Sequence, residues 1–305
     1  MAGYRDDEQY SSNGTHVIHR LRVLPQYLLP KQWLTNLAGR FASQARGKTT
    51  TTVIRWFVKK YQVNMAEALN PDISSYATFN DFFTRALKPG ARPLATAALI
   101  CPVDGAISQF GDIKQDQIFQ AKGHSYSTTA LVGGDSALAA QFQNGSFATL
   151  YLSPKDYHRI HMPCDGTLKR MIYVPGDLFS VNPTTARGVP GLFARNERVV
   201  CVFDTDTGPF VLVLVGATIV GSMATVWHGQ INPTRYGDSS AEVREWRYDD
   251  ELISLKQGDE MGRFMLGSTV VMLFPENRSK TMAFNPTWAA GGAIQLGQAM
   301  CQIKA

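Results

Sequence analysis

The chain has 305 residues, of which 44% are hydrophobic, and it carries a formal net charge of +5. This composition excludes a disordered or fibrous protein and supplies enough apolar side chains for one large folded unit or two smaller ones. The cysteines are widely spaced and include no Cys-x-x-Cys pair, which excludes a disulfide framework or a four-thiolate metal site and favours a reducing, cytosolic setting; they are Cys101, Cys164, Cys201 and Cys301.

The first predicted unit, residues 1–65, is basic and helical. Between Gln9 and Ala66 there are nine Lys or Arg and no Asp or Glu, so the positive charge of the chain is concentrated here. Apolar residues recur at helical spacing over 33–41 and again over 53–61. Apolar helix faces with Trp and Phe, flanked by cations and free of acids, are typical of helices that lie in a lipid interface. We therefore expect this unit to bind an anionic membrane surface.

The basic unit has two other possible roles, covering the protein core and binding nucleic acid. The apolar faces could instead cover the protein core. Nucleic acid is not expected as a partner, because the aromatic residues lie on the apolar faces and not among the basic side chains. Neither a signal peptide nor a spanning helix is expected, since the N-terminus is charged and the longest apolar stretch, 210–220, is well below the roughly 20 residues that a span needs.

The second predicted unit, residues 66–305, is rich in strands. A helix is predicted near 79–87, before Lys88-Pro89-Gly90. From Leu99 onward short apolar runs alternate with Gly, Pro, Asp and Asn, which is typical of strands and turns; the runs are 147–152, 168–174, 199–203, 210–220 and 264–274. The predicted fold class is therefore α+β, with N-terminal amphipathic helices followed by a β-rich catalytic domain of antiparallel or mixed sheets.

Two histidines in Tyr157-His-Arg-Ile-His-Met-Pro163 are candidates for proton transfer. On a regular strand His158 and His161 would face opposite sides, so both serve one pocket only if the chain turns. A core histidine and a metal site are the alternatives, and no metal is expected because no further ligands follow at short spacing. Asp104, before Gly105, is a residue typical of turns and also a carboxylate that could orient an imidazole.

The sequence Gly267-Ser268 interrupts the last apolar run, from Phe264 to Phe274. Inside a buried strand a glycine weakens the ladder and a serine hydroxyl needs a partner. A β-bulge is the simple explanation. Ser268 is not in the Gly-x-Ser-x-Gly elbow of an ordinary serine hydrolase. The sharper hypothesis is that Ser268 attacks the peptide carbonyl directly before it.

Several long blocks in the same order resemble the bacterial phosphatidylserine decarboxylase family. The resemblance runs from about residue 24 to residue 274. Its blocks are Leu28 to Thr35, Val103-Asp104-Gly105, Lys122 to Tyr126, Tyr157 to Pro163, Val174 to Asn182, Phe193 to Arg198 and Leu266-Gly267-Ser268-Thr269.

This resemblance implies a self-cleaving proenzyme. Cleavage between Gly267 and Ser268 would give a large β chain (1–267) and a small α chain (268–305), with a pyruvoyl group derived from Ser268. His161 would be the base for Ser268, and Asp104 would hold the imidazole of His161. The pyruvoyl group would form a Schiff base with phosphatidylserine, releasing CO2 and leaving phosphatidylethanolamine, with His158 as the proton donor.

The resemblance also implies a location and partners. The enzyme would be peripheral on the cytoplasmic face of the inner membrane, with its own cleaved chains and a possible second copy, as a homodimer, for partners. Two other functions stay open at this point. One is a Cys/His hydrolase that uses Cys164 or Cys201; the other is a membrane-bound, non-enzymatic binding module with a lipoyl-carrier-like β core, suggested by the repeated Pro-x-Asp-Gly turns at 102–105 and 163–166.

Overall fold

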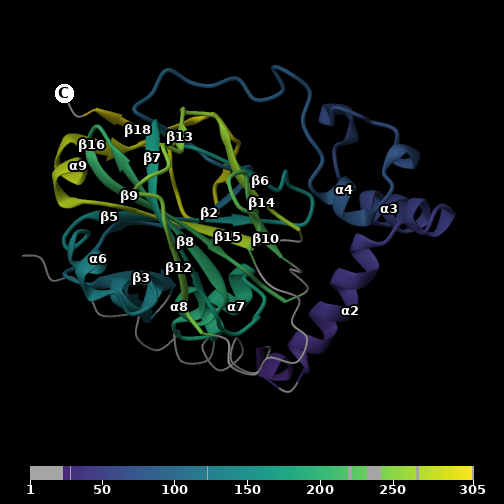
Figure 1. Cartoon of the computed structure of the whole chain (residues 1–305), viewed down its shortest axis with the longest axis horizontal. Coiled ribbons are helices and arrows are strands. Elements are labelled where there is room, and N and C mark those ends of the chain that lie inside the picture. The colour runs from purple at the N-terminus through teal and green to yellow at the C-terminus, as the bar shows by residue number, and fades with distance from the viewer. Residues whose placement is uncertain are drawn as a thin grey trace, which may run out of the picture.

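The helices of the N-terminal part lie together at one end of a β-rich body (Figure 1). This arrangement comes from a computed structural model. It describes residues 23–303 except for Leu28, Lys122, 219–221, 232–241 and 266–267, and it describes Gln32 and Ser268 through their backbone alone. The predicted features of residues 1–22 therefore lie outside the described residues.

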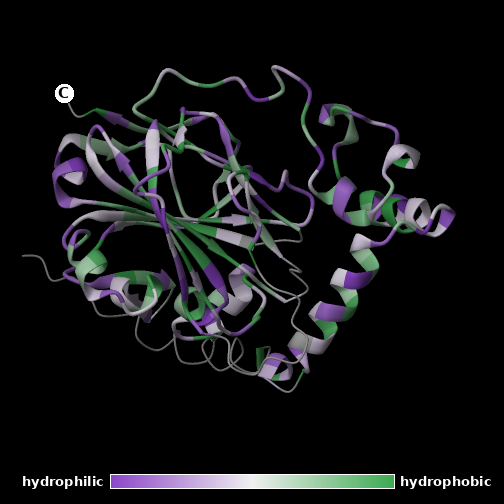
Figure 2. Cartoon of the chain, in the orientation of Figure 1, coloured by the Kyte–Doolittle hydropathy of each residue, from purple (hydrophilic) through white to green (hydrophobic). Residues whose placement is uncertain are grey.

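The helices and turns between residues 23 and 83, called the helical unit from here on, share a small aromatic core. Its elements are a helical turn at 23–27, α2 (Lys31–Ser43), α3 (Lys48–Tyr61), the 3-10 turns η1 (Met65–Glu67) and η2 (Ile73–Ser75), and α4 (Phe79–Phe83). Polar and apolar residues alternate along α2 and α3 (Figure 2). In α3 the buried side chains of Thr50, Ile54 and Phe57 recur at helical spacing, and Phe57 packs against α4.

The central sheet has nine strands, all antiparallel to their neighbours. Along one path they are β12 (Arg244–Arg247), β7 (Gly166–Val174), β8 (Arg198–Thr205), β9 (Gly208–Val215), β15 (Ser268–Phe274), β5 (Ser146–Leu152), β2 (Gly105–Asp112) and β17 (Ala293–Ile294), and β13 (Ser254–Leu255) pairs with β7.

The middle strands are apolar almost throughout because both faces of the sheet are covered. In β15 the side chains of Val270 and Met272 enter one hydrophobic cluster, and those of Val271 and Leu273 enter the other. This is the period of two that a strand imposes. Short helices cover the second face: α5 (Thr128–Leu131), α6 (Ser136–Ala140), α7 (Pro183–Gly188) and α8 (Leu192–Arg195).

Three smaller sheets and one more helix complete the described part of the chain. They are β1 (Leu99–Ile100), β18 (Ala299–Ile303) and β16 (Met282–Phe284); β11 (Gly229–Gln230), β10 (Met223–Thr225), β14 (Glu260–Phe264) and β6 (Arg159–His161); the hairpin of β3 (Gln117–Ala121) and β4 (His124–Ser127); and α9 (Glu276–Thr281). The predicted α+β class is confirmed.

Three predicted elements need correction. The helix predicted near 79–87 is shorter, since α4 ends at Phe83. The apolar run 264–274 is not one strand, since β14 ends at Phe264 and β15 begins at Ser268 in a different sheet. The run 210–220 is a strand only to Val215. Among the described residues no helix is both long and apolar enough to cross a membrane.

Candidate active site

Ser268 is the first residue of β15, the strand between β9 and β5 in the central sheet. Its backbone is in register with Leu152, and that of Thr269 with Tyr151 on one side and Val215 on the other. Gly267 lies outside the described residues. Ser268 thus stands at the end of a strand that both neighbours hold in place, and not in the middle of a continuous strand.

His158 is fully buried directly before β6. Its Nδ1–H donates to the Asp156 carbonyl oxygen at 2.8 Å, and its ring packs on Phe83 with 4.1 Å between centroids. Its Nε2 is buried and has no hydrogen-bond partner among the described residues. Burial, together with the charge of Arg85, lowers the pKa of His158 to about 3, although the hydrogen bond to Asp156 opposes the shift. The imidazole is therefore neutral near pH 7, and its free lone pair is on Nε2.

His158 also lies next to the chain that leads to Ser268. The amide of Phe264, the last residue of β14, donates to the His158 carbonyl oxygen at 3.0 Å. The predicted proton donor is thus hydrogen-bonded through its backbone to the segment that enters the predicted cleavage position.

His161 is held at both ring nitrogens. Nδ1–H donates to the Gly258 carbonyl oxygen at 2.7 Å, which leaves Nε2 to accept from the Tyr157 hydroxyl at 3.0 Å. Burial lowers the pKa of His161, while the hydrogen bond to Gly258 and the charges of Glu260 and Asp104 act in the opposite direction. Nε2 is thus the ring nitrogen that can take a proton.

The predicted hydrogen bond between Asp104 and His161 is wrong for this structure. The buried Asp104 carboxylate accepts from Arg92 Nε and Nη2, at 2.9 Å to Oδ1 and 2.6 Å to Oδ2. Its Oδ1 also accepts from the Leu296 amide at 2.9 Å. The physical reason is that Arg92 offers a bidentate, charge-assisted partner, which a neutral imidazole cannot match. Asp104 acts on His161 through its charge alone.

A hollow of about 210 Å³ opens beside the start of β15. It brings together aromatic rings of α3 and α4, the end of β5 and two loops. Leu152, the backbone partner of Ser268, is one of its walls. The lining residues are Phe57, Tyr61, Phe83, Tyr151, Leu152, Pro154, Ser180, Val181, Asn182, Ala217 and Thr218. Tyr151 has no signal in the sequence beyond its place in the apolar run 147–152, whereas Ser180, Asn182 and the nearby Tyr157 all lie in family blocks.

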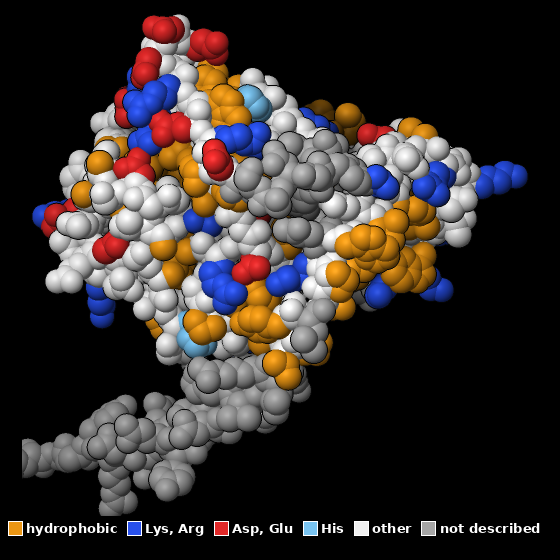
Figure 3. Space-filling model, turned by 60° about the horizontal axis from the view of Figure 1, so that its bottom comes forward, with side chains coloured by type: hydrophobic (Ala, Val, Ile, Leu, Met, Phe, Trp, Pro, Cys, Tyr) orange, Lys and Arg blue, Asp and Glu red, His pale blue; other side chains and the backbone are white. Residues whose placement is uncertain are grey.

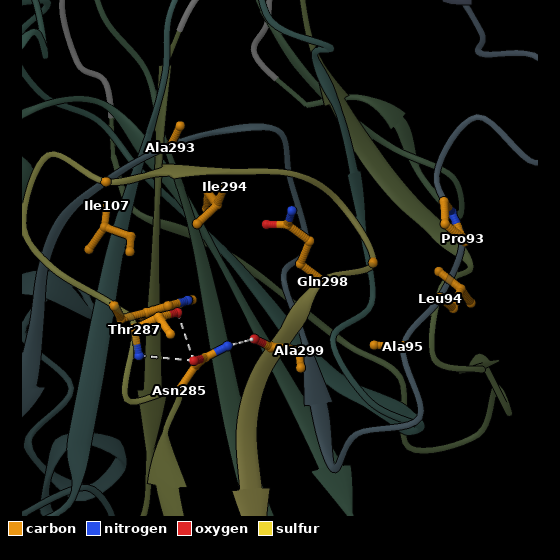
Figure 4. Close-up of a pocket in the computed structure, with 13 residues that line it drawn as sticks. Pro93, Leu94, Ala95, Ile107, Asn285, Thr287, Ala293, Ile294, Gln298 and Ala299 are labelled. Carbon is orange, nitrogen blue, oxygen red and sulfur yellow. Dashed lines mark hydrogen bonds between the residues drawn. The ribbon is translucent and has the colours of Figure 1, made fainter.

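A larger hollow of about 500 Å³ lies elsewhere, between the segment 93–95 and the segment 285–299 (Figure 4). Its polar groups bind one another: Asn285 accepts from Thr287 and donates to the Ala299 carbonyl oxygen. Neither predicted histidine lines either hollow, nor does Asp104. The smaller hollow is the better candidate for the active site because its Leu152 pairs with Ser268 and its Phe83 packs on the ring of His158.

The cysteines do not form a nucleophilic site in the part of the chain that the structure describes. Cys201 is fully buried in β8, and burial raises the pKa of its thiol. Burial also raises the pKa of the Cys164 thiol. Since the thiolate is the nucleophile, these environments do not favour a Cys/His hydrolase.

Comparisons with known proteins bear on the same residues. A family model described as phosphatidylserine decarboxylase matches residues 79–302, and a second model, described as PSD, matches residues 21–62. The phosphatidylserine decarboxylase proenzyme of Albidiferax ferrireducens is 73% identical over 93% of this chain and 97% of that protein. The proenzymes of the same name from Dechloromonas aromatica and Herminiimonas arsenicoxydans are 73% and 70% identical, over 92% and 94% of this chain and 97% and 95% of their own lengths. The chain belongs to the phosphatidylserine decarboxylase family.

Proposed function

We propose that this protein is a phosphatidylserine decarboxylase that matures by cutting itself between Gly267 and Ser268. The observation that carries the proposal is the place of Ser268, at the start of β15 and in register with Leu152 in the wall of the 210 Å³ hollow. A new chain end at position 268 would thus be held by β5, and from Thr269 onward also by β9, beside a space for substrate. The proenzyme names of relatives 70–73% identical add support.

Self-cleavage begins with attack of Ser268 Oγ on the Gly267 carbonyl carbon. His161 Nε2 takes the hydroxyl proton, and the negative charge of Asp104 helps to stabilise the imidazolium that forms. Collapse of the tetrahedral adduct breaks the Gly267–Ser268 C–N bond, so Gly267 becomes an ester of the Ser268 hydroxyl. Elimination then removes the Ser268 α proton and breaks the Cβ–O bond, so that Gly267 leaves as the carboxylate end of the large chain and position 268 becomes a dehydroalanine. Its imine tautomer is hydrolysed by water, which releases ammonia and gives the pyruvoyl group. Attack within one chain needs mainly orientation, which a strand fixed on both sides provides.

The residues around position 268 fit a pyruvoyl group. His158 Nε2 is a buried acceptor that finds no partner in the described part of the chain, and the neighbouring hollow is lined mainly by apolar and aromatic side chains. When present, the pyruvoyl ketone supplies an electron sink for the carbon that loses CO2. His158 holds the proton that this carbon receives. Because burial disfavours the imidazolium, His158 takes up that proton only when the anionic substrate lies beside Nε2.

The helical unit is the proposed membrane-binding surface. Large apolar side chains on it are exposed, and they are Leu24, Tyr27, Leu29, Trp33, Leu37 and Trp56. Figure 3 shows a hydrophobic patch with Lys and Arg at its edges. α3 joins this surface to the site, since Trp56 is exposed while the next residue, Phe57, lines the hollow. The serine headgroup would enter along α3 while the acyl chains stay in the cytoplasmic leaflet. The homodimer remains a prediction.

The double variant Trp33→Ser/Trp56→Ser should bind anionic vesicles at least about tenfold more weakly, because each indole contributes apolar area to the bilayer interface. Both side chains are more than half exposed, at 61% and 54%, so the fold should be unaffected. Flotation with phosphatidylglycerol vesicles measures the binding. Leu252→Ser is the matched control, since Leu252 is 86% exposed on the β-rich body. Equal flotation of the double variant and wild type would refute the surface assignment.

The proposed function predicts that the purified protein consists of two chains and that it releases CO2 from phosphatidylserine. Intact mass of the purified protein should give a large chain that ends at Gly267 and a small chain that begins with a blocked residue at position 268. The same preparation should release CO2 from phosphatidylserine vesicles, resist thiol alkylation and lose activity with a carbonyl reagent. Only full-length chain after long incubation would contradict maturation, and loss of activity on alkylation would favour the Cys/His hydrolase.

A further inference from the structure

We propose that Arg92 is a positioning residue for self-cleavage, which acts by holding in place the Asp104 carboxylate, on the segment that is hydrogen-bonded to His161 through Pro102. The inference rests on the proposed function and adds to it a residue outside the predicted set of Asp104, His158, His161 and Ser268. It begins from the corrected geometry, in which the partner of Asp104 is a guanidinium and not an imidazole.

The Arg92 guanidinium donates to the Asp104 carboxylate through two of its nitrogens, Nε and Nη2. Nε lies 2.9 and 3.1 Å from the two carboxylate oxygens, and Nη2 lies 2.6 Å from Oδ2. Both side chains are only 9% exposed. A bidentate pair fixes the plane of the carboxylate as well as its position. Arg92 therefore fixes the Asp104 carboxylate relative to His161, whose amide donates to the Pro102 carbonyl oxygen, two residues before Asp104, at 2.9 Å.

Glu67 keeps the negative charge of Asp104 from being neutralised by Arg92. Arg92 Nη2 binds Glu67 Oε2 at 2.7 Å, so one guanidinium faces two carboxylates and the cluster keeps a net negative charge. Without Glu67, Arg92 would largely neutralise Asp104. With Glu67, Asp104 still favours the imidazolium of His161, which is the state formed when Ser268 loses its proton.

The cluster joins three parts of the chain. Glu67 belongs to η1 in the helical unit, Arg92 and Asp104 lie on the chain that leads into β2, and Leu296 lies beyond the predicted cleavage position. The segment around Leu296 is tightly packed here: Ala95 N donates to Gly297 O at 2.8 Å, and a Cβ on Gly297 would come within 2.5 Å of the Pro93 carbonyl oxygen. Asp104 thus anchors the future small chain to the large chain before the cut is made.

A purely structural role for Arg92 is the competing explanation, and the chain contains a matched control for it. Arg170 also binds one carboxylate through Nε and Nη2, Glu245 at 3.0 Å for each bond, and a second through Nη2, Asp135 at 2.7 Å. Arg170 lies on β7, and its carboxylates touch neither histidine in any described contact. Arg170→Gln should therefore change stability without changing the rate of cleavage.

The test follows cleavage of the full chain during cell-free synthesis, by denaturing electrophoresis over time, with thermal unfolding of each product. Arg92→Gln should slow the appearance of the two fragments by about 100-fold, the scale of a misplaced catalytic group. Arg92→Lys, which keeps the charge but not the fork, should fall between this variant and wild type. In an Asp104→Asn background Arg92→Gln should cause no further slowing, because its effect passes through Asp104.

Three outcomes would overturn the inference: a wild-type rate for folded Arg92→Gln, full slowing by Arg92→Gln on top of Asp104→Asn, or equal slowing by Arg170→Gln. If Arg92→Gln does not fold, Arg92→Lys decides, and its cleavage at the wild-type rate refutes the positioning role. Failure of the wild-type chain to cut at all would instead refute the proposed function, so the two failures are distinct.

Discussion

Ser268→Ala should remain one uncut polypeptide and should release no CO2 from phosphatidylserine above background. Alanine has no hydroxyl to attack the Gly267 carbonyl, and without the cut no ketone forms at position 268. Every later step of the proposed reaction depends on that ketone, so both readouts are lost together. Intact mass and CO2 release on one preparation measure the two losses.

The substitution should leave the fold intact, which makes the result interpretable. β15 is paired along its length with β5 and β9 through backbone bonds that do not need the Ser268 hydroxyl. Ser146→Ala is the control, because Ser146 is a buried serine on β5, opposite Phe274 at the far end of the same strand pair. It should be cut and should retain activity. A cut Ser268→Ala chain, or decarboxylation by an uncut one, would be incompatible with the mechanism.

Much of the fold follows from periodicity in the sequence. The continuous apolar run at 270–274 predicts a buried strand, and β15 has one hydrophobic cluster on each face. The helical spacing in 53–61 predicts α3, whose Ile54 and Phe57 are buried. These predictions succeed because side-chain direction depends only on local backbone geometry.

The same periodicity cannot say which sheet a strand joins. The run 264–274 is apolar on both sides of Gly267-Ser268, yet its first residue ends β14 in one sheet and its residues from Ser268 onward form β15 in another. Likewise, α5 to α8 have four to six residues each, too few for a helical period to be visible. Tertiary pairing decides both features.

The hydrogen-bond partners of the site residues could not be predicted from the sequence either. Asp104 binds Arg92, 12 positions away, and Leu296, 192 positions away, while His161 binds Gly258. No spacing rule connects such positions. An Asp and a His suggest a pair by their chemistry, but the fold gives the carboxylate a stronger partner. The residue types were read from the sequence, and their pairing came from the structure.

His158→Ala should mature into two fragments and then decarboxylate phosphatidylserine about 100- to 10,000-fold more slowly, the usual loss when a general acid is removed. Cleavage should persist because the proposed base is His161, which has its own partners in Tyr157 and Gly258. Decarboxylation should fail because no other group replaces the Nε2 of His158 as the holder of the returned proton. An uncut His158→Ala chain would mean that the two histidines have the opposite roles.

His161→Ala is the matched comparison. It should block cleavage, the step that His158→Ala leaves intact. It removes Nε2, the only ring nitrogen of His161 that can accept the Ser268 proton, and it leaves His158 with its bond to Asp156. The chain should remain uncut, like Ser268→Ala. Cleavage of His161→Ala at the wild-type rate would remove His161 from the mechanism.

The titration of His158 gives a measurement that is independent of activity. Its pKa is about 3 in the folded protein and near 6.5 when unfolded, so the unfolded state binds more protons between these values. Above pH 6.5 the neutral imidazole makes its full contribution to the free energy of unfolding. As the pH falls toward 3 this contribution decreases, by at most about 1.4 kcal/mol per pH unit. His158→Gln should flatten this part of the curve of unfolding free energy against pH. If the curves of wild type and variant run parallel, His158 is not the buried neutral base that the proposed proton transfer requires.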